Sequence, residues 1–253
     1  MVIDSDSDDS TRERIKKYYP RTEIIRGTKD WWWTRAMYEG VIKVLKQAQK
    51  GDFILEMNND CFPVSGYLAS LIQTAKKHPR CLIGSVSVRA QKPSQVVEAG
   101  IRFDWKNGRV YTLPEEAKTK ILITCLDALP GKGTLIPLEV FGKIGNFDKD
   151  KFPHYIADYE FSHRAKMNGF DLLVDTNAIL KHYWEATGIY SRGSSETYSP
   201  GRAWKILIGR KSMNNITDWL KFLGVACPKE YLLTNYWLLF KKLIKGGMAV
   251  RFK

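Results

Sequence analysis

The chain has 253 residues, of which 44% are hydrophobic and 26% charged, and its formal net charge is +13. This composition is that of a globular protein with a sizeable core, and it excludes a low-complexity chain or a solenoid of repeats. The sequence shows no signal peptide, and no apolar run approaches the roughly 18 residues that a membrane-spanning helix needs. Its four cysteines lie far apart without a CxxC pair, which argues against a zinc site and fits reduced cytosolic thiols. We therefore expect a cytoplasmic protein, either soluble or peripheral on the inner face of the plasma membrane.

The first ninety residues alternate between strand patterns and helix patterns. Strands are expected over residues 1–4, 22–27, 52–57 and 81–88, and helices over 11–18, 32–49 and 63–78, the last opening with Pro63. Such alternation predicts an α/β domain with a largely parallel sheet. Ligands bind beyond the carboxyl ends of the strands in such sheets, and the polar clusters at residues 4–9 and 58–60 fall there.

The second half of the chain has weaker patterns. We expect a tight hairpin at Asn107-Gly108, a glycine-bearing segment over 129–148 that leads into a short helix, a helix over 158–169 ending at Gly169, and two short strands over 170–184 that deliver His182. From about residue 190 the sequence is irregular and then helical. This predicts a main domain over residues 1–190 and a helical, basic C-terminal extension over 191–253.

The positive charge is concentrated in the C-terminal part. Residues 201–253 contain 11 Lys and Arg but only two acids, Asp218 and Glu230. A basic tail indicates a polyanionic neighbour, which is either nucleic acid or an anionic membrane. Lysines interleaved with Trp, Leu and Phe, as in "YLLTNYWLLFKKLIK", favour the membrane interface. The alternative is an amphipathic helix that packs on its own domain.

Six sequence blocks occur in order between residue 2 and about residue 184: "VIDSDSDDST", "GTKDWWWTRAMYEG", "FILEMNND", "LPGKGTLIPLEVFGKIGNFD", "PHYIADYEFSHRAKMNGF" and "AILKH". Together they resemble the inverting family 2 glycosyltransferases of GT-A fold, and most closely the rhamnosyltransferase-like branch. The resemblance implies a three-layer α/β/α sandwich with a mixed, mainly parallel sheet. It starts at what corresponds to the family's second strand, so we expect the first strand, which helps hold the nucleotide base, to be lacking. Either the chain is shortened at its N-terminus or it manages without that element.

The resemblance also implies a site for a divalent metal, Mn²⁺ or Mg²⁺. Asp60 takes the last position of the family's metal motif, and His182 resembles a late histidine that completes the site in some members. Asn58 and Asn59 stand where acids are often found, and their amide oxygens are expected to accept from a ribose hydroxyl or a metal-bound water. Oxygen donors suit both ions, whereas imidazole suits Mn²⁺ better. The alternative for Asp60 is that it lies in a solvated turn and binds no metal. The alternative for His182 is that its role is structural.

The acid pair Asp158 and Glu160 corresponds to the catalytic block of the family. The resemblance implies that Asp158 is the general base that deprotonates the acceptor hydroxyl, with inversion in a single displacement. The alternative is that Asp158 only caps its helix. Glu160 either assists or pairs with Arg164 four residues later.

Donor binding is expected from three further groups. The resemblance places Asp4 and Asp9 at the base-binding turn, although this acidic run could equally be a flexible terminus. Trp31 and Trp32 border the donor pocket, and Trp33 is expected in the core. Gly131 and Gly133 allow a close approach of the backbone to the ligand, and Lys132 either meets a phosphate or is solvated.

These expectations define a function. The resemblance implies a metal-assisted glycosyltransferase that moves a sugar, with rhamnose as a candidate, from a dTDP- or UDP-linked donor. The acceptor would be a hydroxyl of a cell-surface polysaccharide or a lipid-linked glycan. One alternative is a non-catalytic protein of the same fold that binds a partner or a glycan. The other is a basic nucleic-acid-binding protein, but no RRM, KH or helix-turn-helix pattern supports it, and no nucleic-acid partner is expected.

Overall fold

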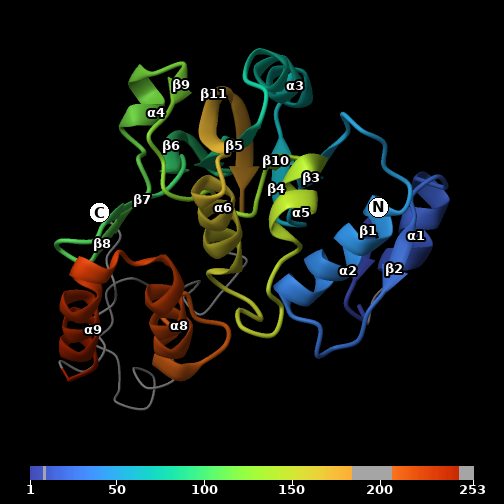
Figure 1. Ribbon diagram of the computed structural model, residues 1–253. Helices are drawn as coiled ribbons and strands as arrows, with labels where there is room; N and C mark the ends of the chain where they lie inside the picture. The colour runs from blue at the N-terminus through green and yellow to red at the C-terminus, as the bar shows by residue number, and fades with distance from the viewer. Residues whose placement is uncertain (8–9, 184–206, 245–253) are drawn as a thin grey trace.

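The computed structural model describes residues 1–7, 10–183 and 207–244 (Figure 1). Its helices are α1 (Thr11–Tyr18), α2 (Trp33–Leu45), α3 (Tyr67–Lys77), α4 (Glu116–Thr119), α5 (Leu138–Ile144), α6 (Ala157–Met167), α8 (Ile216–Ala226) and α9 (Lys229–Ile244). Its strands are β1 (Val2–Asp4), β2 (Ile24–Arg26), β3 (Phe53–Glu56), β4 (Cys61–Pro63), β5 (Cys81–Arg89), β6 (Lys92–Glu98), β7 (Arg102–Asp104), β8 (Arg109–Tyr111), β9 (Leu122–Ile123), β10 (Thr134–Pro137) and β11 (Asp171–His182).

The central sheet is mixed. Its strands lie in the order β3-β10-β5-β11-β4, with β6 beside β5 and β9 beside β11. Strands β5 and β11 are parallel, and β10 runs antiparallel to both β3 and β5. Thus β3, β5 and β11 point in one direction, with β10 reversed between two of them. The pair β1 and β2 forms a separate parallel sheet.

The sheet is covered on both faces. Successive residues of a strand point to opposite faces, and neighbours on β11 accordingly belong to different hydrophobic clusters. Leu173 packs with Leu71 of α3, whereas Leu172 packs with Phe161 of α6 and Phe141 of α5. Figure 1 shows α3 and α6 on different sides of the sheet. The expected α/β/α sandwich with a mixed sheet is therefore confirmed.

Several local predictions hold. Helix α1 has the expected bounds, and β7 and β8 form the predicted hairpin around Asn107-Gly108. Helix α6 ends at Met167, and Gly169 follows with a φ of 86° in the left-handed region that favours glycine.

Three predictions about local structure were wrong. Pro63 does not open a helix but ends β4; α3 starts only at Tyr67, after Gly66, whose φ is 80°. Residues 171–182 form one strand rather than two, because a bulge between Asp175 and Ile179 lets the strand continue. The glycine-bearing segment before α5 contains a strand, β10, which the sequence analysis did not anticipate.

Helices α8 and α9 form the C-terminal part of the described chain. Phe222 of α8 is fully buried against Ile156 and Ala157, at the start of α6. In α9 the amide of Asn235 donates a hydrogen bond of 2.6 Å to the carbonyl of Trp105, next to the β7–β8 hairpin. None of the described helices is long and apolar enough to cross a membrane. The expected irregular segment after residue 190 lies largely outside the described residues.

Candidate active site

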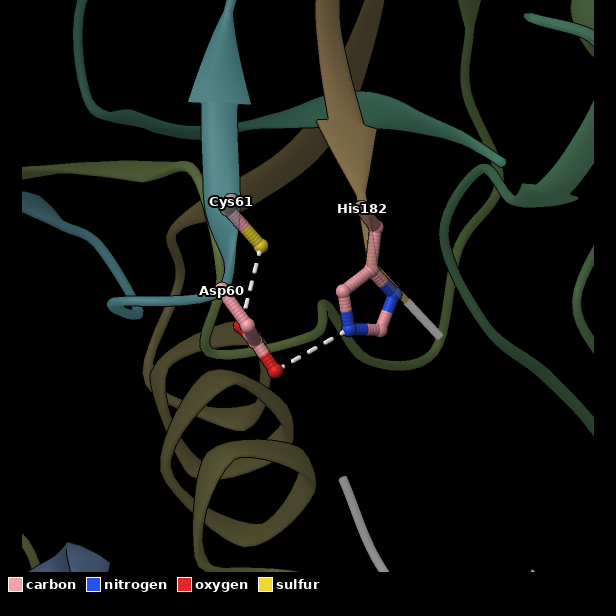
Figure 2. Close-up of side chains that lie close together, drawn as sticks. All are labelled: Asp60, Cys61 and His182. Atoms are coloured by element: carbon pink, nitrogen blue, oxygen red, sulfur yellow. Dashed lines mark hydrogen bonds and ion pairs between the residues drawn. The ribbon is translucent and has the colours of Figure 1, made fainter. Parts of the chain in front are cut away.

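Asp60 and His182 meet at the edge of the sheet. Strands β4 and β11 are antiparallel, and His182 lies opposite Cys61 in their register. The side chains of Asp60, Cys61 and His182 therefore converge from two neighbouring strands (Figure 2). His182 Nε2 lies 3.3 Å from Asp60 Oδ2, and the thiol of Cys61 is 3.4 Å from Asp60 Oδ1. The side chain of Asp60 is only 12% exposed and that of His182 only 6%.

This cluster fits a divalent ion. The three ligand atoms lie within 4.8 Å of one another. Burial raises the pKa of Cys61 to about 12, and the charge of Asp60 adds to this, so the thiol is protonated at neutral pH. The useful donors are consequently the Asp60 carboxylate and the His182 imidazole, an oxygen and nitrogen pair that suits Mn²⁺. The structure thus brings together the two residues that the sequence analysis named as metal ligands.

Asn58 and Asn59 differ in their surroundings. The amide oxygen of Asn58 accepts a hydrogen bond of 3.0 Å from the indole Nε1 of Trp33, whereas Asn59 is exposed. Trp33 also packs edge-on against Phe147 and lies against the hydrophobic core, although it is only partly buried. Asn58 therefore ties the turn before Asp60 to the start of α2.

Asp158 is partly buried at the start of α6. Its Oδ2 accepts a hydrogen bond of 2.8 Å from the backbone N–H of Gly131, and its Oδ1 accepts one of 3.0 Å from that of Tyr159. Burial raises the pKa of Asp158 to about 6; the Gly131 hydrogen bond opposes this rise, and the charge of Glu98 adds to it. The N-cap residue of α6 is Ile156, so Asp158 does not occupy the capping position. A carboxylate with this pKa is ionised at pH 7 and basic enough to take a proton.

Glu160 lies apart from Asp158. Residues two apart on a helix face away from one another. The carboxylate of Glu160 accepts a hydrogen bond of 2.6 Å from Arg164 Nε, and the Arg164 guanidinium also donates 3.0 Å to the carbonyl of Asn146. Glu160 and Arg164 line a separate cleft of about 520 Å³ together with Phe222. Of the two alternatives for Glu160, the structure shows the ion pair with Arg164.

The glycines of the "PGKG" loop are required by close packing. A Cβ on Gly131 would lie 2.6 Å from the Trp33 ring and 3.0 Å from the Cβ of Asp158. Gly133 has a φ of 76°, and its N–H donates 2.7 Å to the carbonyl of Glu56. The loop is thereby fixed between β3 and α6, against Asp158.

Lys132 of this loop forms an ion pair that the sequence analysis missed. Its Nζ lies 2.8 Å from Oε2 of Glu98, and the two side chains are 16% (Lys132) and 8% (Glu98) exposed. Burial disfavours the charged form of Lys132, but the carboxylate of Glu98 outweighs it and raises the pKa of Lys132. Lys132 is therefore paired with a carboxylate and mostly buried rather than solvated.

Glu56 is the second acid that was missed. It is 3% exposed at the end of β3. Burial raises the pKa of Glu56 well above its usual value, and the charge of Asp158 adds to this. Both Glu56 and Glu98 are the last residues of their strands. In the sequence each acid directly follows apolar residues, as in "FILE" and "VVE", and this pattern could have indicated a buried acid at the end of a strand.

Three further residues predicted to bind the donor, Asp4, Trp31 and Trp32, contact other side chains of the protein. Asp4 is buried and accepts a 2.9 Å hydrogen bond from the N–H of Ser7, and it also pairs with Arg12. Burial works to raise the pKa of Asp4, but these partners hold it below its usual value. The ring of Trp31 lies 5.4 Å from the guanidinium of Arg35, and that of Trp32 lies 5.3 Å from His154. Asp9 lies outside the described residues.

The family model described as "Glycosyl transferase family 2" matches residues 1–128, which is half of the chain. The chain belongs to glycosyl transferase family 2. No curated protein sequence gives a significant match.

Solved structures show that the fold of this family 2 chain is that of known glycosyltransferases. GalNAc-T7, solved with UDP, GalNAc and Mn²⁺, aligns with a TM-score of 0.56 at 15% identity, over 98% of this chain and 51% of its own. The mannosyltransferase PcManGT from Pyrobaculum calidifontis, solved with GDP-Man and Mn²⁺, aligns with a TM-score of 0.55 at 17% identity, over 96% and 63%. The family 2 chain thus spans about half to two thirds of the length of these two proteins. At these identities the likeness concerns the fold.

Proposed function

We propose that this family 2 glycosyltransferase is an inverting enzyme, with Asp158 as general base and with Asp60 and His182 as the ligands of a divalent ion. The observation that carries the proposal is the pairing of Asp60 with His182, together with the partly buried carboxyl of Asp158, whose pKa is raised to about 6. One residue links the two centres. Burial raises the pKa of Tyr155, and the charges of Lys132, Asp158 and Asp60 all act on it, so this phenol lies within electrostatic reach of all three.

The proposed reaction is a single displacement. The acceptor O–H gives its proton to Asp158 while its oxygen attacks the anomeric carbon of the sugar. The bond from that carbon to the diphosphate oxygen breaks, the diphosphate leaves with the electron pair, and a glycosidic bond of inverted configuration forms. A bound Mn²⁺ or Mg²⁺ supplies positive charge to the leaving diphosphate. The hydrogen bonds from Gly131 and Tyr159 hold the Asp158 carboxylate in place for the proton transfer.

For the substrates, we propose a dTDP- or UDP-linked donor and a glycan acceptor, on a cell-surface polysaccharide or a lipid. Rhamnose is the first sugar to test, because the six sequence blocks resemble the rhamnosyltransferase-like branch most closely. The two solved relatives were crystallised with UDP and with GDP-Man, which supports a nucleotide-linked donor in general.

We also propose that residues 1–190 form the transferase domain and that the extension over 191–253 rests on the cytoplasmic face of an anionic membrane. Leu233, Trp237 and Phe240 of α9 are 82%, 52% and 51% exposed. At helical spacing they share one face, where the rings of Trp237 and Phe240 stack and Lys241 Nζ lies 5.0 Å from the Trp237 ring. Apolar side chains beside a lysine suit a bilayer interface.

A thermal-shift screen tests donor binding. The wild type is heated with UDP, dTDP and GDP and their sugars, with and without Mn²⁺, because a ligand that binds only the folded state raises the unfolding midpoint. We expect a shift with at least one nucleoside diphosphate, larger with Mn²⁺. No shift with any of them would contradict an active donor site, and a shift without any turnover would favour a non-catalytic binding protein.

A further inference from the structure

Glu98 makes two polar contacts deep in the protein. It ends β6, and it is 6% exposed. Its Oε2 pairs with Lys132 Nζ at 2.8 Å, and its Oε1 accepts a hydrogen bond of 3.3 Å from the phenol of Tyr159. Taking both charges of an ion pair out of water costs about as much as their attraction returns, so stability alone gives a weak reason for such a pair.

The ion pair of Lys132 with Glu98 lies beside the loop that contacts Asp158. Lys132 follows Gly131, whose N–H is bonded to Asp158. On the other side, the phenol of Tyr155 is under the influence of Lys132, Asp158 and Asp60 together. The ammonium of Lys132 is therefore within electrostatic reach of Asp158, and it acts on the same phenol as Asp60.

We propose that Glu98 is a positioning residue that holds the Lys132 ammonium between the general base and the metal ligands, where it binds the donor's diphosphate. The inference rests on the proposed function. A lysine side chain is long and flexible, so ordering it costs conformational entropy. If the pair with Glu98 fixes Lys132 in advance, this entropy is not lost when the ligand binds. An ammonium carries three N–H donors, so the pair with Glu98 is compatible with a bond to a phosphate oxygen. With a single carboxylate, Asp60, in the "NND" turn, a fixed cation would share the neutralisation of the diphosphate with the metal.

The test compares diphosphate with monophosphate. Calorimetry measures the binding of whichever of UDP, dTDP and GDP binds the wild type, and of the matching monophosphate, at fixed Mn²⁺. We expect Glu98→Gln to bind the diphosphate about tenfold more weakly and the monophosphate as the wild type does. Lys132→Met should show the same loss of selectivity, and adding Glu98→Gln to it should cause no further loss. Glu116→Gln, which breaks the 2.8 Å ion pair with Arg102 away from the site, should change neither affinity.

The outcomes separate this inference from the proposed function. If no nucleoside diphosphate binds the wild type, the proposed function fails and this inference with it. If the wild type binds but Glu98→Gln keeps the ratio of diphosphate to monophosphate affinity, only the positioning role is overturned. An equal loss of both affinities would indicate a merely structural role and would also overturn it. Where Glu98→Gln does not fold, Glu98→Asp replaces it, because it keeps the charge on a shorter side chain. A lowered ratio of diphosphate to monophosphate affinity in Glu98→Asp would support the positioning role, and an unchanged ratio would overturn it.

Discussion

The imidazole Nε2 of His182 lies 3.3 Å from the carboxylate of Asp60, although the two residues are 122 positions apart in the chain. The register of β4 with β11 produces this contact, because His182 is opposite Cys61 and thus next to Asp60. One residue comes from the turn after β3 and the other from the end of the longest strand. Neither segment could form a metal site alone.

Removing either ligand should weaken metal binding. We expect Asp60→Asn to lose Mn²⁺-dependent nucleotide binding by at least tenfold, because it removes the only charged donor of the pair. His182→Ala should cost less, because it removes a neutral donor. Titration of Mn²⁺ at constant nucleotide measures both. Wild-type metal dependence in Asp60→Asn would refute the assignment.

The reaction should depend on pH through Asp158. The pKa of this carboxyl is raised from 3.8 to about 6, and a base must be ionised to accept a proton. The value of kcat/KM should therefore rise about tenfold per pH unit below pH 6 and level off above it. A rate that is flat between pH 5 and pH 7 would count against Asp158 as the base.

The same shift predicts how stability changes with pH. The folded state has the higher pKa, so between pH 3.8 and about 6 it binds more protons than the unfolded state, and stability falls as pH rises through that window. Relative to Asp158→Asn, the wild type should lose up to about 1.4 kcal/mol per pH unit there and run parallel above pH 6. Denaturant unfolding of both proteins at several pH values measures the difference. Parallel curves over the whole range would show that the raised pKa is absent.

Gly133 should tolerate no side chain. A Cβ there would contact Leu180 and lie 2.6 Å from the Tyr67 hydroxyl, and its φ of 76° disfavours other residues. Gly133→Ala should lower the free energy of unfolding by about 3 kcal/mol. Gly142→Ala in α5 is the matched control: nothing lies within 4 Å of its Cβ position, and it should be neutral or raise stability by up to about 1 kcal/mol. Equal effects of the two substitutions would contradict the packing described for the loop.

The α9 surface should bind anionic lipid. We expect the double substitution Trp237→Ala and Phe240→Ala to reduce sedimentation with phosphatidylglycerol and phosphatidylcholine vesicles about tenfold. Tyr18→Ala, which removes an aromatic ring that is 63% exposed on α1, should have no effect. Binding of the wild type to phosphatidylcholine alone should be weak. Unchanged sedimentation of the double variant would exclude this face as the contact.

The sequence predicted the early alternating elements well because their patterns are local. The bounds of α1 and the hairpin at Asn107-Gly108 follow from helical spacing and turn chemistry. Strand β10 was not predicted from the sequence, because it has only four residues. A short apolar run after glycines shows neither the period of a helix nor that of a strand. The bulge between Asp175 and Ile179 depends on pairing with β5 and leaves no local trace.

The candidate site was predictable only where a motif marked it. Asp60, His182 and Asp158 were named through the family resemblance, and the structure brings Asp60 and His182 together. Glu98 and its pairing with Lys132 were not foreseen, because the contact joins β6 to a loop 34 positions later. For Glu160 the sequence left two alternatives, assistance in catalysis and pairing with Arg164. The structure shows the pairing with Arg164.

The most direct test of the account is a turnover measurement on the wild type and Asp158→Asn, with the donor that the binding screen identifies. Release of nucleoside diphosphate is followed with a glycan acceptor, and the configuration of the new bond is read by NMR. We predict turnover by the wild type with inversion, and a rate at least about a hundredfold lower for Asp158→Asn with donor binding retained. Retention of configuration, or an Asp158→Asn variant as active as the wild type, would contradict the account.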